Sequence, residues 1–270
     1  MKKIVFLLLF AGAITVGKGQ ELYPYTEPAS NMPTRALAAK LTTNYGYFSG
    51  PLKQRYTPEV QAGFNKNLMA HVGTTFGNMH TEDLKWESIY ATAKYRFLSK
   101  DEVHQHFRMA AFAEGGYSQN EAAYDELNIA GDVSGLQAGL IATELVNKFA
   151  VSTTVSYIHS LAPKGEHDHY NPAEKAVSYS LSAGYLVLPL EYTSYDQTNF
   201  NIYAELLGQK ALDKDAYFVD LAPAIQLIFK STAKLNVGYR FELGGTARRN
   251  MDNSLMVSFE YLFLNALKKK

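Results

Sequence analysis

Cysteine is absent from the 270-residue sequence, and this absence excludes several classes of protein at once. Without a thiol, the chain has no disulfide scaffold, no thiolate metal site, no cysteine nucleophile and no lipid-anchored cysteine. An exported chain of this length then needs another source of stability. A large core or a closed β-barrel would supply it.

The sequence also lacks an excess of charge of one sign and a hydrophobic run long enough to cross a membrane as a helix. Lys and Arg number 26, and so do Asp and Glu, so no basic excess points to a nucleic-acid partner. No apolar run beyond the N-terminus approaches the roughly 20 residues of a transmembrane helix, and the mean hydropathy is −0.19. These values still allow a membrane barrel, whose apolar residues occupy alternate positions and average out.

The N-terminus has the form of a secretory signal peptide. Residues 1–3 (MKK) are basic, residues 4–16 are mostly apolar, and residues 17–19 (GKG) place small residues before Gln20. The apolar run is too short to span a membrane comfortably. We therefore predict export, with residues 1–19 removed as a signal peptide. Cleavage would leave 23 basic against 26 acidic residues, a net charge of −3.

The remaining sequence predicts an irregular lead-in followed by strands. Residues 20–33 contain three prolines and predict a periplasmic lead-in without regular structure. Residues 34–270 show no helical stripe and instead alternate between apolar and polar positions. The expected strands are 34–48, 55–64, 68–77, 86–98, 106–118, 133–146, 149–160, 174–188, 199–209, 215–230, 233–243 and 252–264. Most reach the roughly 9–11 residues of a tilted transmembrane strand, whereas globular strands are nearer 5–6 residues.

The final segment, SLMVSFEYLFL at 254–264, illustrates the two faces. Leu255, Val257, Phe259, Tyr261 and Phe263 share one face, while serines and Glu260 occupy the other. In a soluble sandwich the apolar face would point inward, and in a membrane barrel it would point to lipid. The length of the strands and the aromatic residues near their ends favour the barrel. We predict an all-β fold: an antiparallel outer-membrane barrel of about 12 strands over residues 34–270.

The connections carry a second signal. Alternate connections are tight, such as 65–67, 147–148 and 231–232, whereas those between them tend to be long, such as 120–132 and 161–173. Short turns on one rim and longer loops on the other are typical of bacterial outer-membrane barrels. The sequence follows this pattern imperfectly, because the eighth connection (189–198) is longer than expected.

Several stretches support a resemblance to a known group of proteins. The exported start, ELYPYTEPASNMP, RYTPEVQAGFNKNLMAHVGTTF, HFRMAAFAEGGYS and the aromatic terminal strand resemble uncharacterised outer-membrane β-barrel proteins of Bacteroidota. The likeness spans essentially the whole mature chain and implies a transporter-like or porin-like protein of a Gram-negative outer membrane. It brings no catalytic motif.

Charged residues on the predicted inner face are the main candidates for a functional site. As a lumen constriction we select Lys94, Arg96, Arg108, Glu114, Glu205, Arg240, Glu242 and Glu260. Glu59, Asp220 and Lys40 share this face. Two interpretations stay open: the charges select solutes along a pathway, or they form a paired network that fills the lumen.

Histidine pairs offer a second, weaker site. His167 and His169 alternate in the long seventh connection and could present two imidazoles to a metal ion, and His104 and His106 form another such pair. Polar loops also collect such residues because they are solvated, and two ligands make a weak metal site. No G-x-S-x-G, H-E-x-x-H or phosphate-loop motif occurs. We therefore expect that the protein is not an enzyme and that it binds no cofactor.

We predict a narrow passive channel or transporter for small polar or charged solutes. The alternative is a non-conducting barrel whose outer loops bind a metal ion or a partner. Outer-membrane lipid and a small polar solute are the expected partners, and nucleic acid is not. The sequence does not distinguish a monomer from an oligomer.

Overall fold

The computed structural model describes residues 22–46, 52–162, 170–191, 194 and 196–267. The expected signal peptide and the His167 and His169 pair lie outside these residues.

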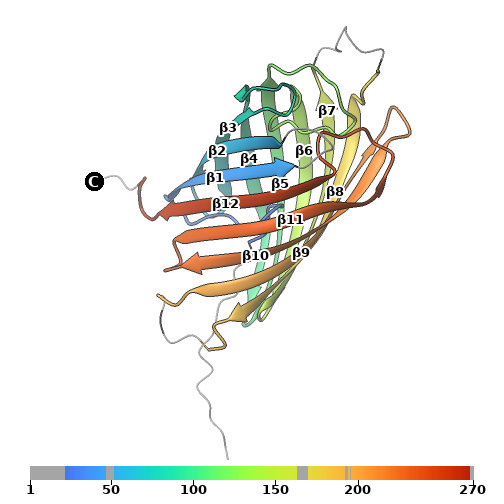
Figure 1. The fold of residues 1–270 in the computed structure, drawn as a ribbon. Coiled ribbons are helices and arrows are strands. Elements are labelled where there is room, and N and C mark those ends of the chain that lie inside the picture. Colours follow the sequence, from blue (N-terminus) through green and yellow to red (C-terminus); the bar gives the residue numbers. More distant parts are fainter. Residues whose placement is uncertain (1–21, 47–51, 163–169, 192–193, 195, 268–270) are drawn as a thin grey trace, which may run out of the picture.

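Twelve antiparallel strands form one closed barrel in which each strand pairs with its sequence neighbours (Figure 1). β1 also pairs with β12, from Leu37 opposite Phe263 to Gly46 opposite Ser254, and this closes the sheet. The strands are β1 Leu37–Gly46, β2 Lys53–Gly63, β3 Leu68–Gly77, β4 Lys85–Glu102, β5 Gln105–Ser118, β6 Gly135–Val146, β7 Phe149–Ser160, β8 Lys175–Leu188, β9 Asn199–Ala211, β10 Tyr217–Phe229, β11 Ala233–Gly245 and β12 Asn253–Phe263. The predicted fold class and strand count are confirmed.

The alternation of polar and apolar residues along each strand explains which side chains face the interior of the barrel and which face outward. In β9, Asn199, Asn201 and Tyr203 are buried on the inner face, while Ile202 and Leu206 are exposed on the outer face. The same alternation gives the barrel an exposed apolar belt. Its members include Leu41, Val60, Val72, Ile89, Leu136, Leu140, Val155, Leu181, Ile202, Ile225, Phe229 and Phe259. An apolar surface of this extent is unfavourable in contact with water but favourable in contact with the hydrocarbon of a membrane. The belt is therefore the lipid-facing surface, as predicted.

The two rims differ as the sequence predicts. One rim, which we call the short-turn rim, carries the tight β4–β5, β6–β7 and β10–β11 connections. His104, Asn147 and Lys230 in these turns have positive φ, the backbone conformation that tight turns demand. The opposite, long-loop rim carries the 16-residue β5–β6 connection, residues 119–134, which separates Ser118 from Gly135.

Two segments outside the strands occupy the interior of the barrel. Residues 22–33, the lead-in, have no regular secondary structure and contact inward-facing side chains near the short-turn rim. Residues 119–134, which we call the mouth loop, fold inward at the long-loop rim. Among the described residues, no helix is long and apolar enough to cross a membrane.

Candidate functional site

The lead-in is held inside the barrel by hydrogen bonds to both sides of the lumen. Glu205 on β9 accepts the Tyr25 backbone N–H at 2.9 Å and the Thr26 hydroxyl at 2.6 Å. From β6, Thr143 Oγ1 accepts the Ala29 N–H at 2.9 Å. These bonds correct the expectation that the lead-in lies in the periplasm. An extended chain with unpaired backbone groups needs hydrogen-bond partners, and the polar lumen supplies them.

Charge and aromatic packing also hold the lead-in. The Lys94 ammonium on β4 lies 2.9 Å from a Glu27 carboxylate oxygen and donates to the Pro28 carbonyl at 2.9 Å. Tyr23 packs edge-on against Tyr203, with ring centroids 5.7 Å apart. The result is a segment anchored to β4, β6 and β9, across the lumen rather than along one wall.

Gly238 on β11 makes room for the lead-in. A Cβ atom at this position would lie 2.7 Å from the Tyr25 ring, closer than carbon atoms pack. Any larger residue would force the tyrosine away from the wall.

The mouth loop is anchored at the opposite rim. The Gln209 side chain of β9 bonds both backbone groups of Leu127: its oxygen accepts the N–H at 2.7 Å, and its amide donates to the carbonyl at 3.0 Å. Leu127, Ile129 and Val133 are buried in one apolar cluster with Ile158 of β7. The loop therefore crosses from β5 and β6 toward β9 and narrows the mouth.

A buried ion network joins the mouth loop to β2 and β4. Arg55 on β2 lies 2.6 Å from both Asp132 in the loop and Glu87 on β4. His80, from the β3–β4 connection, lies 2.9 Å from Asp132. Burial works against a charged Asp132, but the Arg55 guanidinium and the His80 hydrogen bond outweigh it and hold the pKa of Asp132 well below its usual range.

A second network occupies the far side of the mouth. Arg249, in the β11–β12 connection, lies 2.7 Å from Asp220 of β10, 3.0 Å from Glu126 of the mouth loop and 3.1 Å from Glu242. Arg240 also pairs with Asp220 and with Glu126, the latter at 2.8 Å. Two arginines and three carboxylates thus fix the mouth loop to β10 and β11.

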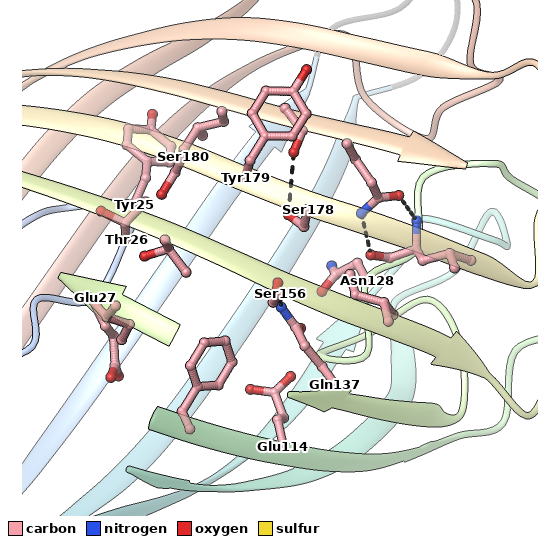
Figure 2. Close-up of a pocket in the computed structure, with 18 of the residues that line it drawn as sticks. Tyr25, Thr26, Glu27, Glu114, Asn128, Gln137, Ser156, Ser178, Tyr179 and Ser180 are labelled. Carbon is pink, nitrogen blue, oxygen red and sulfur yellow. Dashed lines mark hydrogen bonds between the residues drawn. The ribbon is translucent and has the colours of Figure 1, made fainter. Parts of the chain in front are cut away.

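A cavity of about 400 Å³ lies between the lead-in and the mouth loop (Figure 2). The lead-in contributes Tyr25, Thr26 and Glu27, and the mouth loop contributes Glu126, Leu127 and Asn128. The barrel wall contributes mostly polar side chains. They include His71, Thr92, Glu114, Gln137, Thr154, Ser156, Ser178, Ser180, Gln209 and Arg240, with Phe112 and Phe218 among the apolar ones. The volume falls in the range of small-molecule sites.

The eight predicted constriction residues do not form one ring. Lys94 and Glu205 hold the lead-in, Glu114 lines the cavity, and Arg240 and Glu242 belong to the mouth network. The other three lie closer to the short-turn rim. There Arg96 donates to the Lys66 carbonyl, Arg108 pairs with Asp101 at 2.7 Å, and Glu260 pairs with Lys234 at 2.6 Å. Their role in selecting solutes stays a prediction.

Sequence reasoning missed the residues that come from outside the strands. Glu27, Glu126, Asp132 and Arg249 have no strand periodicity to assign them to a face. For Glu126, Asp132 and Arg249 the one signal is the concentration of charge in 125–132 and in 248–249, within connections longer than a turn requires, and Glu27 in the lead-in has no such signal.

No group of three or more His, Cys, Asp or Glu side chains within the described ranges has the arrangement of a metal site. The His167 and His169 proposal lies outside those ranges. His106 Nδ1 lies 2.9 Å from Asp101 at the short-turn rim, and His104 occupies the neighbouring turn.

Comparisons with known proteins identify a fold rather than a family. No protein-family model and no curated protein sequence matches the chain. The solved KdgM porin is 9% identical, has a TM-score of 0.50, and the match covers 84% of this chain and 98% of that one. The COG4313 outer membrane channel from Pseudomonas putida F1 is 14% identical, has a TM-score of 0.56, and the match covers 88% and 100%.

At such identities the likeness shows the fold alone, and the Bacteroidota resemblance stays a prediction. Together with the apolar belt, however, the fold supports the expected location. The chain has the porin-like barrel fold of outer-membrane proteins of Gram-negative bacteria.

Proposed function

We propose that the protein is a narrow, gated outer-membrane channel for small polar solutes and that it has no enzymatic site. The observation that carries this proposal is the position of the polar cavity inside the barrel, lined by strands β3 to β11 and by two segments that are not part of the wall. A solute crossing the barrel would pass the lead-in and the mouth loop, and the cavity would hold it between them.

The lead-in is the better candidate for the moving part. It enters from the short-turn rim and is attached to the barrel wall by side-chain bonds, whereas both ends of the mouth loop continue into strands. The mouth loop also carries the buried Arg55–Asp132 pair, whose separation would leave charges unpaired. The intact chain should therefore conduct weakly, and the rate of passage should depend on release of the lead-in.

Structural relatives do not define the solute. One solved structure is that of the KdgM porin in complex with disordered oligogalacturonate, a polyanion. In this chain Lys94 and Arg240 bind carboxylates of the lead-in and of the mouth loop. This pairing supports a solute other than a polyanion.

Planar-bilayer recordings of the intact mature chain and of a variant lacking residues 22–30 test the proposal. We expect small conductance from the intact chain and several-fold larger conductance from the deletion. A matched control deletes 190–196, which lies in the β8–β9 connection at the same rim. Absence of conductance from all three proteins, each shown to be folded, would overturn the channel and support a non-conducting barrel that binds through its outer loops.

A further inference from the structure

The cavity contains one carboxylate that forms no ion pair with a described residue, since the histidine of the lining, His71, lies 2.9 Å from Glu59 and 3.6 Å from Glu27 instead. Glu114 on β5 accepts the Thr92 hydroxyl at 2.7 Å through Oε2. Within the described part of the chain, no lysine, arginine or histidine nitrogen forms an ion pair with Glu114, and no donor is bonded to its Oε1. The other cavity carboxylates differ, because Glu27 pairs with Lys94 and Glu126 pairs with two arginines.

The wall beside Glu114, along β7 and β8, is rich in hydroxyl groups. Ser156 on β7 accepts the Gln137 amide at 2.8 Å, and Thr154 and Ser180 also line the cavity. Among the residues described, no side-chain hydrogen bond engages the hydroxyls of Thr154 or Ser180. β5, β6, β7 and β8 are consecutive strands of the wall, and Figure 2 shows Glu114 at one end of a row of side chains with Ser156, Ser178 and Ser180 further along it. A ligand lying along this wall would meet a negatively charged acceptor at one end and donor–acceptor hydroxyls at the other.

We propose that this cavity binds a small, hydroxyl-rich solute that carries one protonated amine, the chemistry of an amino sugar. The ammonium group lies against Glu114, and the hydroxyls of the solute bond to Thr154, Ser156 and Ser180. The Phe112 ring, also in the lining, offers an apolar surface to the carbon face of such a molecule. The inference rests on the proposed function and names the class of solute that this channel holds.

Charge complementarity distinguishes this solute from its neutral and acidic analogues. A neutral sugar would leave the Glu114 carboxylate without an ion pair in a confined, weakly screened space. An acidic sugar would place two negative charges close together, while Arg240 is already bound to Asp220 and Glu126. A protonated amine on the solute supplies the positive charge that pairs with Glu114.

Equilibrium dialysis of the full mature chain in detergent at pH 7, with glucosamine, glucose and glucuronate as probes, tests the inference. The three molecules share a ring and differ in charge. We expect glucosamine to bind about ten-fold more tightly than glucose, since a charge-assisted hydrogen bond contributes about 1.4 kcal/mol more than a neutral one, and that difference is ten-fold in affinity. Glucuronate should bind least. Equal affinity for all three probes would overturn the proposal.

Variants assign the preference to the cavity. Glu114→Gln should abolish the advantage of glucosamine over glucose, and Glu260→Gln, which changes an inward carboxylate outside the cavity lining, should preserve it. Ser180→Leu should weaken binding of every probe, because the larger leucine side chain would occupy part of the cavity. If Glu114→Gln does not fold, retained glucosamine binding in Ser180→Leu overturns the proposal by itself.

Failure of this inference is separable from failure of the channel. If the three probes bind without a charge preference, but deletion of 22–30 raises the conductance, the amino-sugar site is contradicted and the gated channel is still supported. If glucosamine binds selectively but no variant conducts, the binding site is supported and the channel is contradicted.

Discussion

Arg249 shows how much of the mouth depends on a single side chain. Its guanidinium is fully buried, pairs with three carboxylates and lies 4.0 Å above the centre of the Phe218 ring. A buried arginine is tolerated only when its charge is compensated, and each carboxylate in turn depends on it. By contrast, Arg108 near the short-turn rim pairs mainly with Asp101, whose side chain is 50% exposed.

We therefore expect Arg249→Met to lower the free energy of unfolding by about 3–5 kcal/mol. Arg108→Met should cost at most about 1 kcal/mol, because partly exposed ion pairs contribute little. Urea unfolding in detergent, followed by the fluorescence of Trp86, measures both. Equal small losses would show that the mouth network does not stabilise the barrel.

At the scale of elements, two segments without strand character decide what the lumen contains. Side-chain acceptors of the barrel wall hold the lead-in in place. Several of these hydrogen bonds converge on the carboxylate of Glu205. This carboxylate, fully buried, accepts bonds from Tyr25, Thr26 and Ser182.

Glu205→Leu should release the lead-in. The change removes the acceptor of the Tyr25 N–H and of the Thr26 hydroxyl, each bond to a charged group being worth about 1.5–3 kcal/mol. Hydrogen-exchange mass spectrometry should then show faster exchange in peptides covering 22–30, with β-strand peptides unchanged. Glu144→Leu, a change on the exposed surface of β6, is the control. Unchanged protection of the lead-in would contradict its proposed anchoring.

The mouth loop should be released by acid. Burial opposes the charged forms of Asp132 and Glu126, but their arginine partners outweigh burial, so each pKa lies below its ordinary value. For Asp125, burial is likewise outweighed by hydrogen bonds from Lys214 and Tyr170, which lower its pKa. A carboxyl whose folded pKa is lowered stabilises the loop fully at neutral pH, and this contribution is lost as the pH falls below the unfolded value of about 4.

We expect limited proteolysis within 119–134 to be slow at pH 7 and to accelerate as the pH falls from about 4 to 3, with an acid-active protease used at each pH. Asp132→Asn should raise cleavage at neutral pH and flatten the dependence. A loop equally protected at pH 7 and pH 3 would show that these ion pairs do not hold it.

At the scale of the whole molecule, the belt determines the surroundings of the barrel. Leu140 lies midway along β6 and is 54% exposed, while Leu136 lies near the long-loop end of the same strand and is 56% exposed. Their similar exposure makes them a matched pair that differs in depth.

Leu140→Arg should destabilise the barrel in lipid vesicles by about 2–4 kcal/mol, because the side chain lies near the bilayer centre. Leu136→Arg should cost about 1 kcal/mol or less, since the charge reaches the interface. Denaturant titration in vesicles measures the difference. Equal effects of the two changes would contradict a lipid-facing belt at this depth.

The sequence by itself determined the twelve strands, their faces and the two kinds of rim. Alternation is a local property, and pairing between consecutive strands requires only short connections, so periodicity in segments such as 199–209 and 252–264 sufficed. The tertiary structure alone decided how the lumen is filled. Whether Glu27 meets Lys94, or Asp132 meets Arg55, depends on where the irregular segments lie within the closed barrel. No local pattern encodes such contacts, because they join residues 67 to 77 positions apart through side chains rather than through a backbone ladder.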